Sequence, residues 1–175
     1  DHRDLHSFPT RRSSDLDSEI TTGGTKSLVE QLPLPPLKIL LVEDQEASRL
    51  FVLRILERLG HNVVPAADGL MAMELLEREL YDLVLLDIQM PVMGGEEVIA
   101  RIREEEKGTG AHLPVIALTA HALSGDRELL LSMGFDGYLS KPISIAELLK
   151  EAGEVLKRLR VARLENRTES GGSRI

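Results

Sequence analysis

The stretch YDLVLLDIQMPVMGG, residues 81–95, contains a buried strand that ends on a charge. Leu83 to Leu86 form an unbroken apolar run, which is typical of a strand covered on both faces. Asp87 follows directly, and Pro91 and the pair Gly94–Gly95 then interrupt the chain. Because ligands bind beyond the carboxyl ends of parallel strands, a carboxylate at this position indicates a functional site.

The composition is that of a globular domain. The chain has 175 residues, of which 42% are hydrophobic and 29% charged. Its net charge of −8 argues against a nucleic-acid-binding surface. No apolar run reaches membrane length, so we expect no membrane contact by this segment, and the first residues lack the apolar region of a secretory signal. The absence of cysteine excludes a disulfide framework, and we expect a cytoplasmic location.

The first 36 residues carry no periodic apolar pattern and are expected to lie outside the folded domain. The segment from Asp4 to Leu16 resembles the conceptual translation of a short-read sequencing adapter, so we interpret residues 1–16 as non-native. The natural start of the gene product is then expected to be missing. Residues 17–36 are rich in Ser, Thr, Gly and Pro and are predicted to be a linker.

From Leu37 onward, apolar runs typical of strands alternate with helical periodicity. Five strands and five helices within about 120 residues predict one parallel sheet covered on both faces. We place this domain at residues 37–159 and interpret the polar residues 160–175 as a disordered tail or a linker. The expected strands are Lys38–Val42, Asn62–Ala66, Asp82–Asp87, Pro114–Thr119 and Asp136–Ser140. The expected helices are Glu46–Leu59, 68–79, 95–106, Leu123–Met133 and Ser144–Leu159.

Polar side chains end four of these strands. Glu43 and Asp44 follow the first, Asp87 ends the third, Thr119 ends the fourth, and Lys141 follows the fifth. Since the carboxyl ends of parallel strands share one edge of the sheet, these groups are expected to converge. Three clustered carboxylates repel one another unless a cation intervenes, and oxygen ligands suit a hard ion such as Mg²⁺. One carboxylate can then act as a nucleophile, while Lys and Thr donate to phosphoryl oxygens.

Four motifs in this order resemble the response-regulator receiver domain of two-component signalling: LVED, LLDIQMPVMGG, VIALTA and GYLSKPI. The similarity extends from Lys38 to about Leu159. It implies a flavodoxin-like, doubly wound sheet in the order 2-1-3-4-5 with five helices. The longer pattern TAHALSGDRE…GFDGYLSKPI further resembles receivers attached to hybrid sensor histidine kinases.

The resemblance implies a role for each polar residue. Asp87 is expected to be the phosphoacceptor, and Thr119 and Lys141 are expected to bind the phosphoryl group. Mg²⁺ would be bound by Glu43, Asp44, Asp87 and the backbone carbonyl of Gln89, while Thr119 and Tyr138 would form the switch. The expected partners are a histidine kinase, a histidine phosphotransfer protein, or both, and no nucleic acid. We also predict that the Lys141–Pro142 bond is cis.

Several functions remain open on the sequence alone. The chain is interpreted as the C-terminal fragment of a hybrid histidine kinase, which itself can be membrane-bound, and the alternative is a stand-alone response regulator. A receiver catalyses its own phosphorylation and dephosphorylation but is not a turnover enzyme. An aspartate-nucleophile phosphatase is less favoured, because residue 89 is Gln where that class needs an acid. A phosphorylation-independent pseudo-receiver is disfavoured, because every expected polar residue is present.

Overall fold

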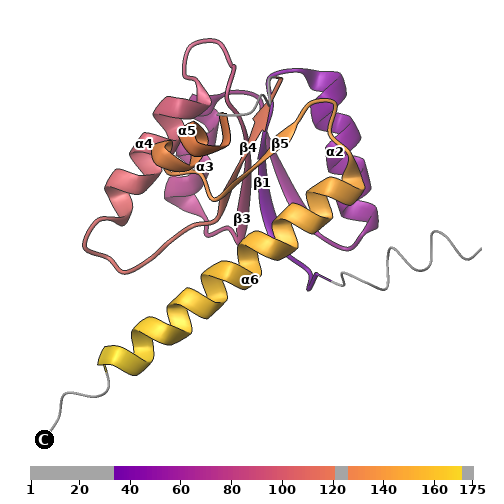
Figure 1. Ribbon diagram of the computed structural model, residues 1–175. Coiled ribbons are helices and arrows are strands. Elements are labelled where there is room, and N and C mark those ends of the chain that lie inside the picture. Colours follow the sequence, from indigo (N-terminus) through magenta and orange to yellow (C-terminus); the bar gives the residue numbers. More distant parts are fainter. Residues whose placement is uncertain (1–33, 121–125, 171–175) are drawn as a thin grey trace, which may run out of the picture. The chain divides into compact units, whose positions relative to one another are not determined.

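Five short apolar stretches form one sheet in the computed structural model, which describes residues 34–120 and 126–170 (Figure 1). The strand order is β2-β1-β3-β4-β5, and all neighbouring strands are parallel. This confirms the predicted fold class and the order 2-1-3-4-5. The strands are β1 (Lys38–Val42), β2 (Asn62–Ala66), β3 (Leu83–Asp87), β4 (Val115–Thr119) and β5 (Gly137–Ser140).

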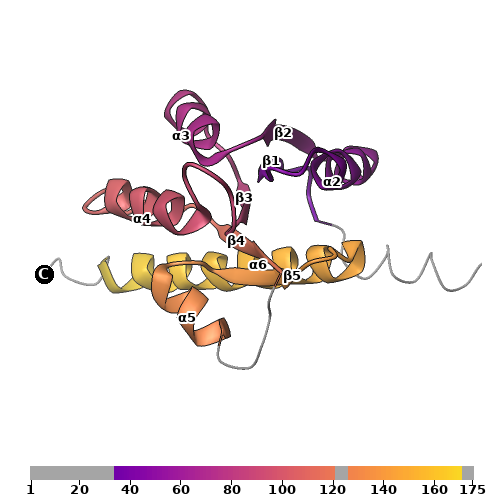
Figure 2. The same cartoon turned by 90° about the horizontal axis from the view of Figure 1, so that it is seen from above.

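Helices cover both faces of the sheet, because successive strand residues point to opposite sides. Leu86 and Ala117 pack with α3, α4 and α5 on one face, whereas Leu85 and Leu118 pack with α2 and α6 on the other. Figure 2 shows α3 and α4 on one side of the sheet and α2 on the other. The helices are α2 (Glu46–Arg58), α3 (Gly69–Arg78), α4 (Gly95–Glu106), α5 (Asp126–Met133) and α6 (Ile145–Ser170).

The central strand, β3, is buried along its whole length and supports the side chain at its tip. All five of its residues are buried, and Leu85 and Leu86 have no exposed surface. Removing either leucine side chain would leave a cavity and cost about 2–5 kcal/mol of stability. Asp87 is therefore carried on a strand that is fixed on both faces.

Apart from the start of α5 and the end of α6, the predicted boundaries agree with the structure to within about two residues, the usual scatter at element ends. Asp68 caps α3, since its Oδ1 accepts a hydrogen bond of 2.8 Å from the amide of Met71. Gly60 follows the end of α2 with a φ of 90°, a conformation that glycine adopts without strain. Leu123, the predicted first residue of α5, lies outside the described residues.

The last helix is longer than the sequence suggested. We expected it to end near Leu159 and residues 160–175 to be a disordered tail or a linker, but α6 continues to Ser170. Residues 160–170 are therefore helical, and they contain no Gly or Pro that would interrupt the helix. Long as it is, α6 is too polar to cross a bilayer, and no other described helix qualifies as a membrane span.

Candidate functional site

The carboxyl edge of the sheet brings together the acidic residues predicted from the sequence. Glu43 and Asp44 follow β1, and Asp87 ends the neighbouring β3. One oxygen from each of these three carboxylates lies within 4.8 Å of the other two. The pairing of β1 with both β2 and β3 fixes this arrangement, because Glu43 continues the ladder through a 3.1 Å hydrogen bond from its amide to Ala66.

Lys141 directly follows β5, the edge strand two places away from β3, and its side chain reaches the acidic cluster. Its Nζ lies 2.7 Å from Oδ2 of Asp87 and 2.7 Å from Oε2 of Glu43. The Lys141–Pro142 bond that redirects the chain after β5 is cis, as predicted. The Lys141 amide also donates a 2.8 Å hydrogen bond to the carbonyl of Thr119. Burial alone would lower the pKa of Lys141, but its hydrogen bond to Asp87 and the negative charges of Asp87 and Glu43 together raise it.

Glu43 is the most deeply buried acid of the site, with 1% of its surface exposed. Its Oε1 accepts a 3.2 Å hydrogen bond from the amide of Gln45. The Oε2 atom is close to Lys141 but not aligned with it as a hydrogen-bond acceptor, so the contact is an ion pair only. Burial raises the pKa of Glu43, and the charge of Asp87 adds to this, while Lys141 opposes it.

Asp87 is held by the loop that follows it. It is 2% exposed, and its Oδ1 accepts a 3.0 Å hydrogen bond from the amide of Gln89. The loop then turns back on itself, so that Gly95 donates its amide to the carbonyl of Ile88 at 2.9 Å. A side chain at Gly95 would lie 2.8 Å from Cα of Ile88 and closer still to the carbonyl oxygen of Asp87. Only glycine lets α4 begin this close to β3.

The same loop contains a strained residue. Val92 has a φ of 69°, a left-handed conformation that a β-branched side chain rarely adopts. It stands between Pro91 and Met93, whose carbonyl and amide are joined by a 2.9 Å hydrogen bond, and 87% of its surface is exposed. The turn that carries the chain away from Asp87 is therefore tight enough to force an unfavourable backbone conformation.

The two predicted switch residues lie on one face of the sheet. Thr119 ends β4 and is 8% exposed, while Tyr138 on β5 is half-buried. Tyr138 pairs with Ala117, which lies two residues before Thr119 on β4, so both side chains belong to the face covered by α3, α4 and α5. Gln89 joins the site through its amide; that its carbonyl binds a metal stays a prediction.

The acidic cluster has the chemistry of a site for a hard divalent cation. Its ligand atoms are all carboxylate oxygens, the donor type that Mg²⁺ prefers. Two of the three acids are buried, and a buried anionic oxygen of Glu43 lacks an aligned donor. Since burying uncompensated negative charge is costly, a cation at this position would stabilise the cluster. The residues present therefore fit a bound Mg²⁺.

Sequence reasoning missed one residue of the site, Arg49 on α2. Its guanidinium donates hydrogen bonds to the backbone carbonyls of Glu43 and Asp44. An arginine in the first turns of a helix is ordinarily a solvated surface residue, so its identity gave no sign of this contact. The only available signal was its position, close enough along the helix to reach back over the loop.

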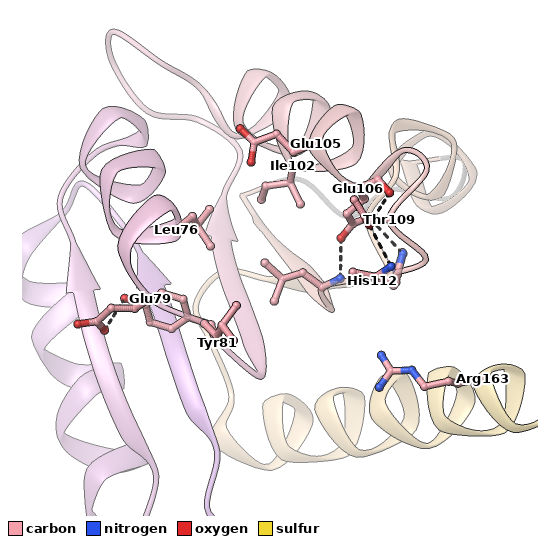
Figure 3. A pocket seen from close by; sticks show the side chains of 12 residues that line it. Leu76, Glu79, Tyr81, Ile102, Glu105, Glu106, Thr109, His112 and Arg163 are labelled. Atoms are coloured by element: carbon pink, nitrogen blue, oxygen red, sulfur yellow. Dashed lines mark hydrogen bonds and ion pairs between the residues drawn. The ribbon is translucent and has the colours of Figure 1, made fainter.

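A cavity of about 350 Å³ lies away from this site, near the amino ends of β3 and β4 (Figure 3). Its lining includes Tyr81, Glu106, His112 and Arg163, and no residue of the acidic cluster. Glu106 is already bound by Arg103 at 2.8 Å and by the amide of Leu113 at 2.6 Å. Because the half-buried Glu106 already has these partners, we assign the chemistry to the carboxyl edge of the sheet and not to this cavity.

Comparison with known proteins gives a consistent picture. The family model described as response regulator receiver domain matches residues 39–152. The chain is 41% identical over 120 residues to the sensor protein GacS of Pseudomonas syringae pv. syringae, covering 65% of this chain and 13% of that protein. It is 34% identical over 115 residues to the polar-differentiation response regulator DivK of Brucella anthropi, covering 66% and 92% respectively.

Solved structures agree with these matches. The receiver domain of the sensor histidine kinase PA1611 from Pseudomonas aeruginosa PAO1, with magnesium coordinated in its active-site cleft, is 39% identical, with a TM-score of 0.62 and coverage of 70% and 99%. The complex of the Saccharomyces cerevisiae phosphotransfer protein Ypd1 with the Ssk1 receiver domain matches at 28% identity, a TM-score of 0.64 and coverage of 67% and 87%. The chain spans 7% to 15% of the length of the first histidine kinases it resembles.

Proposed function

The chain belongs to the family of response regulator receiver domains, and we propose that it accepts a phosphoryl group from a phosphohistidine on Asp87 in the presence of Mg²⁺. The observation that supports this most directly is the position of Lys141, whose Nζ lies 2.7 Å from both Asp87 and Glu43. An ammonium held at the nucleophile is placed to stabilise the negative charge of an incoming phosphoryl group.

In the proposed reaction, a carboxylate oxygen of Asp87 attacks phosphorus. The new oxygen–phosphorus bond forms as the phosphorus–nitrogen bond to the donor imidazole breaks, and the imidazole nitrogen keeps the electron pair and takes up a proton. Lys141 and the hydroxyl of Thr119 would donate to the phosphoryl oxygens. Glu43, Asp44, Asp87 and the carbonyl of Gln89 would hold Mg²⁺, which supplies positive charge beside those oxygens.

The test measures phosphoryl incorporation from an acyl phosphate, with Mg²⁺ or with a chelator. Wild-type protein should be labelled only with Mg²⁺, and Asp87→Asn should not be labelled. Asp82→Asn is a matched control next to the opposite end of β3, because an amide oxygen can still accept the 2.7 Å hydrogen bond that Asp82 receives from the amide of Lys38. Equal labelling of Asp87→Asn and wild type would refute the assignment of the phosphoacceptor.

The phosphodonor is proposed to be a histidine kinase or a histidine phosphotransfer protein. On α2, which begins next to the acidic cluster, Leu50 and Phe51 are 45% and 55% exposed and offer an apolar docking surface. The complex of Ypd1 with a receiver domain supports this class of partner. Phe51→Ser should therefore slow transfer from a phosphorylated protein donor and leave labelling by a small acyl phosphate unchanged.

We further propose that the chain derives from a hybrid histidine kinase acting in the cytoplasm. Its similarity to GacS supports this origin, whereas the match to nearly the whole of DivK supports the alternative of a single-domain regulator. Recovery of the upstream coding sequence decides between them, because a hybrid kinase would encode a catalytic core before residue 17. Family membership argues against the aspartate-nucleophile phosphatase.

A further inference from the structure

Arg49 connects α2 to both acids that follow β1. Its guanidinium Nη1 lies 2.7 Å from the carbonyl oxygen of Glu43 and 3.2 Å from that of Asp44. One nitrogen thus bridges two successive peptide groups. Arg49 is half-buried, in contrast to Arg54 farther along the same helix, which is exposed.

Few other hydrogen bonds hold the junction between β1 and α2 in place. Gln45 precedes the helix, and its side chain makes no capping hydrogen bond. Glu43 is tied to the sheet through its amide and to Gln45 through its carboxylate. For Asp44 the situation differs, since no hydrogen bond or ion pair to its carboxylate is found within residues 34–120 and 126–170. The direction of the Asp44 side chain therefore depends on the orientation of its backbone.

The positive charge of Arg49 lies against backbone carbonyls and not against the carboxylates of the site. It binds neutral carbonyl oxygens, while Lys141 is the cation that contacts the carboxylates of Glu43 and Asp87. Arg49 thus orders the acidic loop without occupying any of the oxygens that a metal ion would need. A cation bound directly to Asp44 would instead compete with the metal.

We propose that Arg49 is a positioning residue for the metal site: by holding the carbonyls of Glu43 and Asp44, it directs their carboxylates toward a shared cation. This inference rests on the proposed function only in requiring that the wild-type site binds Mg²⁺. Residues that orient metal ligands typically contribute about 10- to 100-fold to metal affinity. We expect Arg49→Ala to weaken Mg²⁺ binding by about that factor.

The experiment is a Mg²⁺ titration of the full chain followed by the amide NMR signals of Gln45 and Gln89. Each amide donates to a site carboxylate, Gln45 to Glu43 and Gln89 to Asp87, so each reports on the cluster without any phosphoryl donor. Arg49→Lys retains a cationic donor and should bind Mg²⁺ with an affinity between those of wild type and Arg49→Ala. Arg54→Ala, which removes an exposed arginine from the same helix, should match wild type.

The outcomes separate the two proposals. If wild-type protein shows no saturable Mg²⁺ shift, the proposed function fails. If wild type binds Mg²⁺ and Arg49→Ala binds it within about twofold, the positioning role is wrong, since affinity should fall by a larger factor. A role in stability alone would lower the urea midpoint in chelator and leave the Mg²⁺ affinity unchanged, which also overturns the proposal. Should Arg49→Ala not fold, Arg49→Lys decides: unchanged affinity refutes the inference.

Discussion

The Nζ atom of Lys141 lies 2.7 Å from Oδ2 of Asp87, although 54 residues separate them in the chain. The same nitrogen contacts Glu43, so one ammonium joins two buried acids at the carboxyl ends of neighbouring strands. Without a bound metal, this is the contact that offsets the repulsion between the carboxylates. The stability of the domain and the affinity of its metal site should therefore be linked through Lys141.

We predict that Lys141→Met lowers the free energy of unfolding by about 1–3 kcal/mol in chelator, because two buried acids lose their counter-ion. The loss should be smaller than for a fully enclosed pair, since 22% of the Lys141 side chain is exposed. Mg²⁺ should recover more stability in this variant than in wild type, because the ion then supplies the missing positive charge.

Urea titrations with chelator and with Mg²⁺ measure both effects. Lys150→Met is a suitable control, because Lys150 is an exposed residue of α6 outside the site. An equal gain from Mg²⁺ in wild type and Lys141→Met would show that the ammonium does not compensate the acids.

A second prediction concerns Gly95. Gly95→Ala should destabilise the domain by about 1–3 kcal/mol, because the new methyl group would press on the backbone of Asp87 and Ile88. Gly94→Ala is the matched control: a methyl group there would meet only the carbonyl oxygen of Ile88, at 3.3 Å. Urea unfolding compares the two, and similar losses in both variants would show that close approach at Gly95 is not the cause.

The sequence was sufficient to predict the residues of the acidic site, but not the arginine that holds its backbone or the length of the last helix. Asp87 and Lys141 could be placed together because strand tips in a parallel sheet share an edge, a rule that needs only the order of elements. Arg49 could not be identified, because its contact depends on a side-chain direction over a loop. The end of α6 was misplaced for a different reason: apolar periodicity stops at Leu159 where the sheet ends, although helix propensity continues.

A third prediction concerns His61, which sequence analysis did not single out. The residue is 6% exposed, and its Nδ1 accepts a hydrogen bond of 3.2 Å from the amide of Leu37, so the ring is neutral in the fold. Burial lowers the pKa of His61 below its ordinary value of 6.5. Its contribution to stability is complete above about pH 6.5 and is lost as the pH falls below that value toward the lower pKa of the folded state, because the unfolded chain binds the proton more readily.

The measurement is the urea midpoint of wild type and His61→Asn as a function of pH. The amide oxygen of the variant can accept the Leu37 hydrogen bond, but the side chain does not titrate. Wild type should therefore lose more stability than the variant as the pH drops below about 6.5. Parallel pH profiles for the two proteins would rule out His61 as the titrating group.

The final prediction concerns the switch. Phosphorylation of Asp87 adds negative charge and acceptor oxygens at the sheet edge, and the Thr119 hydroxyl is an uncharged donor at the tip of the adjacent β4. If Thr119 moves toward the phosphoryl group, it vacates space on the face that it shares with Tyr138, and the half-buried ring can turn inward. A coupling of about 1–3 kcal/mol would shift the two states about 5- to 150-fold.

Thr119→Ala should still accept a phosphoryl group, because the nucleophile and the acidic cluster are intact, but its Tyr138 ring signals should no longer change on phosphorylation. Thr119→Ser keeps the hydroxyl and should preserve most of the change. The comparison uses NMR of the Tyr138 ring before and after treatment with acyl phosphate and Mg²⁺, at matched phosphorylation levels. A full shift of the ring signals in Thr119→Ala would mean that Tyr138 responds to Asp87 by a route that does not pass through Thr119.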